Sequence, residues 1–192
     1  MNVPAGFYRF FRGIAAFLLK LMYPVKITGQ ERVPEGAAIV CANHSHFIDP
    51  AIVAVACGKA HQLYFMAKAE LFQRSAAGWL LRKFGAFPVQ RGETDLGAVR
   101  TVMRLLKGGY KVLIFPEGTR VQEADAVAAK TGAVRFASKL NVPIVPVYVP
   151  RHKRLFRAMH VSIGEPYYID EAAAAAYQAA SAELMRRIEA LV

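Results

Sequence analysis

Short apolar segments of strand character alternate with segments of helical periodicity along almost the whole chain, and this alternation constrains the fold more than any other feature. Apolar runs bounded by turn residues are typical of buried strands, whereas apolar residues at three- and four-residue steps are typical of helices. The alternation predicts an α/β fold in which helices flank a mostly parallel, mixed sheet. The predicted strands are residues 25–28, 37–42, 63–67, 86–89, 111–115, 144–149 and 161–163, and the predicted helices are residues 50–57, 75–84, 95–106, 131–140 and a last one from about 171.

Length and composition fit one domain. The 192 residues, 55% of them hydrophobic, can bury one core without a disulfide or a structural metal. We therefore expect residues 1–192 to form a single domain, with an N-terminal helix in residues 1–23 and an α/β core in residues 24–192. Cys41 and Cys57 lie in apolar stretches and are predicted to be reduced core residues, which suits a cytosolic compartment.

The N-terminal segment has the pattern of an amphipathic helix. Its longest uninterrupted apolar stretch, residues 13–19, is far shorter than the roughly 20 residues that span a bilayer. Such a helix can lie in the membrane interface, with its rings in the acyl boundary and its cations on lipid phosphates. The alternative is a helix packed on its own domain. The apolar face comprises Phe7, Phe10, Phe11, Ile14, Phe17, Leu18, Leu21 and Met22, and the opposite face carries Arg9, Arg12 and Lys20.

Two polar clusters follow predicted strands directly. Asn43–Asp49 follows the strand that ends at residue 42, and Glu117–Arg120 follows the strand that ends at residue 115. In sheets of this kind ligands bind outside the carboxyl ends of the strands. We therefore expect the two clusters to share one crevice.

The first cluster pairs a histidine with a carboxylate five residues later. If Asp49 folds back to the ring of His44, one ring nitrogen is held protonated and the other becomes a base. Acyl transfer to an alcohol needs such a base, because a hydroxyl is a poor nucleophile until its proton is removed. Alternatively, Asp49 caps the helix that starts at Pro50; its two oxygens allow both roles together.

The other polar pieces suit a phosphate ester and an acyl chain. Arg91 and Arg120 offer planar forks of donors for a phosphate, and Gly118 allows close backbone approach, although a lone arginine is more often a solvated surface charge. Val142–Val147 has no ionisable group and reads as a strand that shapes an apolar wall. The net charge of +11 also favours anionic partners.

Taken in order, these pieces resemble the motifs of the glycerolipid acyltransferase family, in particular its 1-acylglycerol-3-phosphate acyltransferases. The resemblance covers about Val25 to Tyr168 and includes Phe65–Phe72, which resembles a family segment with a lysine at the phosphate site. It implies His44 as general base, Asp49 as the residue that orients it, Lys68, Arg91 and Arg120 as phosphate ligands, and Glu117, Gly118 and Thr119 around the acceptor.

The resemblance also implies the reaction. A fatty acyl group would pass from acyl-CoA or acyl carrier protein to the sn-2 hydroxyl of 1-acylglycerol-3-phosphate (lysophosphatidic acid), forming phosphatidic acid by direct attack. No cofactor and no metal are implied beyond the thioester co-substrate. The protein would work at the cytoplasmic face of the cell membrane as a peripheral or monotopic protein. Transfer to another lysolipid and a non-catalytic, anionic-lipid-binding module are the alternatives.

Other functions fit these residues less well. His44, His46 and Asp49 resemble a metal-ligand set, but no further cluster of histidines or acids completes it. Ser45 lacks the Gly-x-Ser-x-Gly elbow of serine hydrolases, and Cys41 is expected to be buried. The basic run 151–154 lacks interleaved aromatic residues, so we read it as a solvated loop, or alternatively as a docking patch for anionic lipid or donor, and expect no nucleic-acid partner.

Overall fold

The computed structural model describes residues 3–73, 75–90, 95–122, 128–170 and 176–192. Its centre is one seven-stranded sheet with the strand order β1-β7-β6-β2-β5-β3-β4. Neighbouring strands pair in parallel except β6 and β7, which are antiparallel, so the predicted α/β fold with a mostly parallel mixed sheet is confirmed. The strands are β1 (Val25–Thr28), β2 (Ala38–Ala42), β3 (Leu63–Lys68), β4 (Ala86–Val89), β5 (Lys111–Ile114), β6 (Ile144–Tyr148) and β7 (Met159–Ile163).

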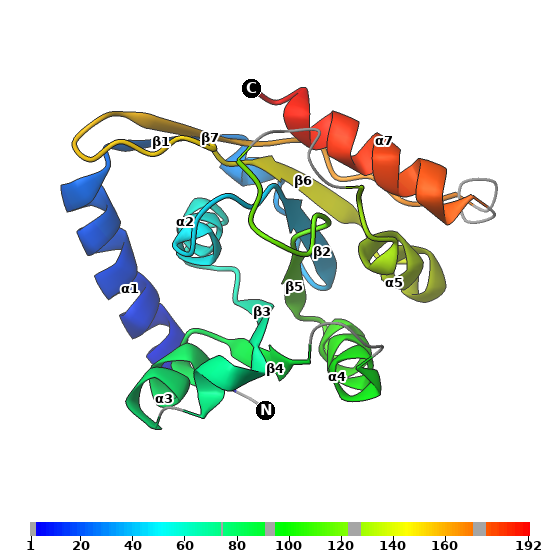
Figure 1. The fold of residues 1–192 in the computed structure, drawn as a ribbon, viewed down its shortest axis with the longest axis horizontal. Coiled ribbons are helices and arrows are strands. Elements are labelled where there is room, and N and C mark those ends of the chain that lie inside the picture. Colours follow the sequence, from blue (N-terminus) through cyan, green and yellow to red (C-terminus); the bar gives the residue numbers. More distant parts are fainter. Residues whose placement is uncertain (1–2, 74, 91–94, 123–127, 171–175) are drawn as a thin grey trace.

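Helices cover both faces of the sheet (Figure 1). One side carries α1 (Ala5–Met22), α2 (Asp49–Ala56) and α3 (Ser75–Lys83), and the other carries α4 (Leu96–Lys107), α5 (Gly132–Leu140) and α7 (Tyr177–Glu189). Two short 3₁₀ turns, η1 (Gln30–Arg32) and η2 (Ala69–Phe72), lie in the connections. Strand β2 occupies the middle of this three-layer arrangement, so any loop that follows it lies between the loops of β5 and β6.

The hydrophobic core lies on both faces of β2. Val40 packs in the cluster that includes α2, and its neighbours Ile39 and Cys41 pack in the cluster that includes α4, α5 and α7. Strands buried on both faces read as continuous apolar runs, which is why the sequence of β2 shows no alternation. Cys41 and Cys57 are buried free thiols, and burial raises the pKa of Cys57 to about 12, so their prediction as reduced core residues is confirmed.

The predicted helix ends differ from the observed ones in instructive ways. The N-cap of α4 is Asp95, whose Oδ1 accepts a hydrogen bond from the amide of Ala98 at 2.9 Å. Helix α2 starts one residue earlier than predicted, with Ile48 in the cap position, so the prediction of Asp49 as the N-cap is wrong. The carboxylate of Asp49 turns back toward the preceding loop instead. The predicted start of the last helix, residue 171, lies outside the described residues, and α7 begins at Tyr177.

The N-terminal helix packs on the domain through one side and leaves an apolar side exposed. Its buried residues are Tyr8, Arg12 and Leu19. The guanidinium of Arg12 donates to the carbonyls of Ala54 and Val55 at 3.0 and 2.7 Å, so its prediction as a lipid-phosphate contact is wrong. The last carbonyls of a helix lack partners within it, and a cation satisfies them well. The exposed apolar residues are Phe7, Phe10, Ile14, Phe17, Leu18, Leu21 and Met22.

None of the described helices is long and apolar enough to cross a bilayer.

Candidate active site

Three adjacent strands bring the polar segments of the chain to one edge of the sheet. β2 pairs with β5 on one side and with β6 on the other. The segments that follow these strands, residues 43–49, 117–122 and 150–153, therefore lie side by side. The side-chain amide Nε2 of Gln122 donates a hydrogen bond to the carbonyl of Ser45 at 3.1 Å. This contact joins the first two segments, as the sequence predicted.

His44 and Asp49 form a buried pair. Nδ1 of His44 lies 3.0 Å from Oδ2 of Asp49, and the same oxygen accepts the backbone amides of Ser45 and His46, each at 2.7 Å. Burial alone would raise the pKa of Asp49, but the hydrogen bond from His44 and the charge of Lys153 hold it below its ordinary value. An ionised carboxylate only accepts hydrogen bonds, so Nδ1 carries the proton and Nε2 is the nitrogen that can take one.

The backbone and ring of His44 are fixed from other directions as well. Its amide donates to Oε2 of Glu117 at 2.6 Å, and its carbonyl accepts the amide of Val121 at 2.7 Å. Its ring stacks on Phe115, with 4.1 Å between the centroids and 20° between the planes. Asn43 ties the start of the loop to β6 through two hydrogen bonds with the backbone of Val149, at 2.7 and 2.8 Å. The imidazole is therefore held in one orientation before any substrate binds.

Glu117 positions the histidine and does not line the pocket. Its exposed fraction is 1%, and Oε1 lies 2.8 Å from Nη2 of Arg151 while Oε2 holds the amide of His44. Burial raises the pKa of Glu117, an effect that the hydrogen bond from Arg151 opposes. Since both oxygens are engaged by the protein, the acyl acceptor has no open contact with this carboxylate.

Two residues of the basic run are buried, and our interpretation of that run as a solvated loop is wrong for both. Arg151 pairs with Glu117 and with Glu189 of α7. Lys153 has a side chain that is 2% exposed and lies 2.8 Å from Oδ1 of Asp49. Each cation compensates a carboxylate that has been taken out of water, which is the usual reason for a buried basic residue. His152, Arg154 and Arg157 are exposed, as predicted.

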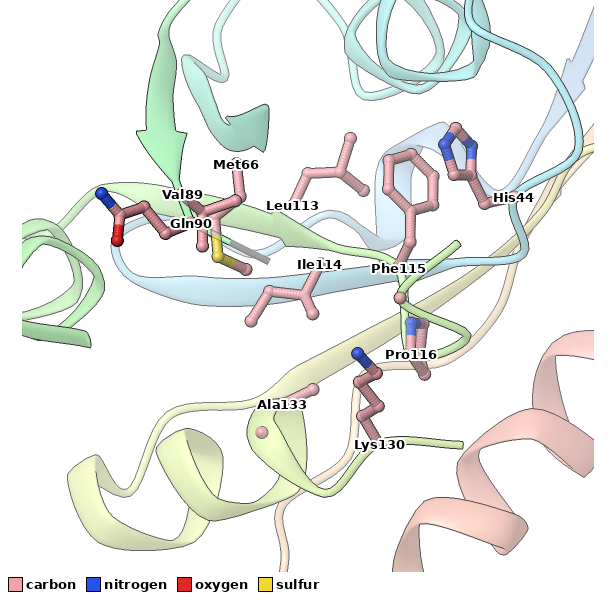
Figure 2. Close-up of a pocket in the computed structure, with 12 residues that line it drawn as sticks. His44, Met66, Val89, Gln90, Leu113, Ile114, Phe115, Pro116, Lys130 and Ala133 are labelled. Atoms are coloured by element: carbon pink, nitrogen blue, oxygen red, sulfur yellow. The ribbon is translucent and has the colours of Figure 1, made fainter. Parts of the chain in front are cut away.

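A pocket of about 230 Å³ opens beside His44. Figure 2 shows His44 and Phe115 at one end of this pocket, Met66 and Val89 toward the other, and Lys130 on the wall formed at the start of α5. Its apolar surface suits an acyl chain. The interpretation of Val142–Val147 as that wall is wrong for this pocket, because no residue of that segment lines it. The apolar lining residues are Met66, Val89, Leu113, Ile114, Phe115, Pro116 and Ala133.

Lys130 brings a positive charge to the same pocket. Its amide donates to the carbonyl of Pro116 at 2.8 Å, which places the residue opposite the turn that carries Gly118. Gly118 has a φ of +67°, and a Cβ there would stand 2.6 Å from Cε of Lys130. The left-handed backbone favours glycine at this position, and a Cβ there would displace the end of the lysine side chain.

Among the described residues, the predicted substrate-binding residues Lys68, Thr119 and Arg120 do not line this pocket. Thr119 and Arg120 are exposed, and Arg120 is near enough to His46 for its charge to lower the pKa of that histidine, after the larger effects of burial and of Lys153. Lys68 is exposed at the end of β3 and lies 3.0 Å from a carboxylate oxygen of Glu70. Arg91 lies outside the described residues.

Sequence reasoning missed Lys130, Arg151 and Lys153. A signal was present for each of them. Lys130 directly precedes the predicted helix 131–140, whose N-terminus must face the carboxyl edge of the sheet because the helix follows the strand 111–115. Arg151 and Lys153 follow the strand 144–149 and so also lie at that edge. The burial of the last two depends on the order of strands, which a linear sequence does not contain.

Fold and site together place the buried pair of His44 and Asp49 beside an apolar pocket that also holds Lys130, at one edge of an α/β sheet. Within the described part of the chain, no group of three or more histidine, cysteine, aspartate or glutamate residues is placed to hold a metal ion. The sequence model of the acyltransferase family matches residues 24–150. The chain belongs to the acyltransferase family.

Proteins of known name agree with this assignment. The chain is 36% identical over 167 residues to the 1-acyl-sn-glycerol-3-phosphate acyltransferase of Bacillus subtilis, covering 84% of this chain and 82% of that protein. It is 33% identical over 145 residues to the protein of the same name from Streptococcus pneumoniae, covering 73% of this chain and 53% of that one. The crystal structure of the 1-acyl-sn-glycerophosphate (LPA) acyltransferase of Thermotoga maritima superposes with a TM-score of 0.72 at 24% identity, covering 96% of this chain and 79% of that one.

Proposed function

We propose that this protein transfers a fatty acyl group from a thioester donor to the free hydroxyl of lysophosphatidic acid, forming phosphatidic acid. The observation that carries the proposal is the buried contact of 3.0 Å between His44 Nδ1 and Asp49 Oδ2, beside a pocket that is apolar and also holds Lys130. The names of the relatives point to the same acceptor.

The chemistry follows from the orientation of the imidazole. Nε2 of His44 removes the proton of the acceptor hydroxyl as its oxygen attacks the thioester carbonyl carbon, forming the new C–O bond. The C–S bond then breaks, and the imidazolium returns its proton to the leaving thiolate. Asp49 stays ionised and stabilises the imidazolium while it exists. No acyl-enzyme is required.

We assign the acceptor phosphate to Lys130, which lines the pocket, and to exposed Arg120, whose charge is close enough to His46 to lower the pKa of that histidine. Replacing Lys130 with methionine keeps the aliphatic stem over Gly118 and removes the charge. We expect the KM for lysophosphatidic acid to rise about 10- to 100-fold with little change in kcat, because a charge-assisted hydrogen bond contributes about 1.5–3 kcal/mol. Steady-state kinetics measure both constants, with exposed Lys107→Met as the control. A fall in kcat at an unchanged KM would remove Lys130 from this role.

The reaction is tested directly by product analysis. Purified protein is incubated with lysophosphatidic acid and either acyl-CoA or acyl carrier protein as donor, and the lipid product is identified by mass spectrometry. We expect phosphatidic acid with at least one donor, and none from the His44→Ala variant. Preferential acylation of a lysolipid without a phosphate monoester would overturn the proposed acceptor.

The exposed apolar surface of the protein suits docking on the cytoplasmic face of a membrane. The face of α1 is extended at both ends by neighbouring segments: Trp79 of α3 packs edge-on against Phe11 with centroids 5.7 Å apart, and the amide of Phe156 donates to the carbonyl of Met22 at 2.7 Å. Phe156 itself is 75% exposed. Exposed cations, Arg9 and Lys20, border the same helix and suit lipid phosphates.

Membrane docking is tested by charging the exposed face. The double variant Phe10→Asp/Phe17→Asp is expected to bind vesicles of anionic phospholipid at least about 100-fold more weakly, because each buried phenyl ring contributes roughly 1.5–3 kcal/mol. Co-sedimentation with vesicles measures the affinity. Exposed Tyr168→Asp serves as the control, and turnover of a short-chain, soluble acceptor should be retained. Equal vesicle binding by both variants would show that α1 does not dock.

A further inference from the structure

The side chain of Lys153 is buried and hydrogen-bonded in the site, beside His44 and Asp49. Its ammonium lies 2.8 Å from Oδ1 of Asp49 and donates to Oγ of Ser45 at 2.9 Å and to the carbonyl of Pro150 at 2.7 Å. Two of the three N–H donors of the ammonium group therefore have hydrogen-bond acceptors in Ser45 and Pro150, and its contact with Asp49 is an ion pair. These contacts hold the charge beside the carboxylate that orients His44.

The carboxylate of Asp49 divides its two oxygens between two partners. Oδ2 takes the ring of His44 and two backbone amides, whereas Oδ1 faces Lys153. Burial holds the pKa of Lys153 below its ordinary value, and the charge of Asp49 opposes this effect, so each group of the pair supports the charged form of the other. The electrostatic potential at the imidazole is therefore that of a compensated carboxylate, which is weaker than that of a carboxylate alone.

Arg151 has the matching role for the backbone. It compensates Glu117, which holds the amide of His44. The segment 150–153 thus supplies one cation for each of the two carboxylates that hold the histidine. Because each cation is paired with a buried carboxylate, the segment 150–153 differs from a surface loop whose charges are solvated.

We propose that Lys153 is a positioning residue of the acyl-transfer reaction, which compensates the charge of Asp49 and so sets how strongly that carboxylate acts on the imidazole of His44. The proposal rests on the proposed function of His44 as the general base. An uncompensated aspartate would favour the imidazolium form, which cannot accept the hydroxyl proton. Lys153 removes part of that bias while it leaves the orienting hydrogen bond intact. The charged and titratable groups around His44 are Asp49 and Lys153 behind the ring, Glu117 and Arg151 behind its backbone, and His46, Arg120 and Lys130 toward the pocket.

The test is the pH dependence of turnover in Lys153→Gln, which keeps a hydrogen-bond donor and loses the charge. We expect the acid limb of the kcat/KM profile to move to higher pH by about one unit, since a unit charge several ångströms away acts with roughly this strength in a protein. Activity lost at pH 7 should return at pH 9. Lys107→Gln, which also removes one positive charge, should superpose on the parent profile.

A purely structural role for Lys153 gives a different result. It would lower kcat/KM equally at every pH and leave the acid limb in place, and this outcome would overturn the proposal. Histidine ¹⁵N NMR of Lys153→Gln follows the protonation of the ring without turnover, and Lys153→Met, which keeps the volume of the stem, is measured in the same way if glutamine disturbs folding. Failure of the parent protein to transfer acyl groups would instead contradict the proposed function.

Discussion

Replacement of His44 by alanine is expected to lower kcat/KM by about 10²- to 10⁴-fold. Positioned acid–base catalysis lowers the activation barrier by roughly 3–5 kcal/mol. Among the described residues, no other histidine ring is hydrogen-bonded to Asp49 and could replace His44 as the base. The loss should fall on kcat, because the general base acts in the transition state and not in the binding of the acceptor.

Acyl transfer from a radiolabelled donor measures this loss. His152→Ala removes an exposed histidine from the neighbouring loop and should leave the rate unchanged. Vesicle binding by His44→Ala should also be unchanged, since the residue lies away from the exposed face of α1. Full turnover by His44→Ala would show that His44 is not the general base, and the proposed mechanism would fail.

The second large effect is on stability. Glu117→Ala should lower the free energy of unfolding by about 3–5 kcal/mol, because it removes the buried carboxylate that faces Arg151 and the acceptor of the His44 amide, and leaves Arg151 with Glu189 as its carboxylate partner. Turnover should fall with it, since the histidine loses its anchor. Urea denaturation measures the first effect and steady-state kinetics the second.

A matched control exists in an exposed ion pair. Glu165 lies 2.9 Å from Arg32, but its side chain is 76% exposed. Glu165→Ala should therefore cost at most about 1 kcal/mol. If the two glutamate variants were destabilised equally, burial of Glu117 would not be the reason for its effect, and its role as the anchor of His44 would fail.

The sequence predicted the order of the elements and the contact between His44 and Asp49. Both rest on local rules: apolar runs and helical spacing for the former, and a five-residue separation across a strand-to-helix turn for the latter. A carboxylate at that separation can reach the ring without any contribution from the rest of the chain.

The positions of Arg12, Arg151 and Lys153 could not be predicted in this way. All three were assigned to solvent or lipid because cations are usually exposed. Each is buried because a distant element presents an oxygen to it: α2 to Arg12, the turn after β5 to Arg151, and the loop after β2 to Lys153. These partners depend on the strand order, which places the loops after β5 and β6 on either side of the loop after β2.

Helix α2 joins the interfacial surface to the reaction centre with very little intervening structure. Asp49 stands on its first turn, and the carbonyls that receive Arg12 stand about 8 Å further along its axis. With α1 docked on a bilayer as proposed, the base would stand less than the length of one short helix from the membrane anchor. A lipid acceptor would then need to rise only a short way out of the leaflet before its hydroxyl meets the histidine.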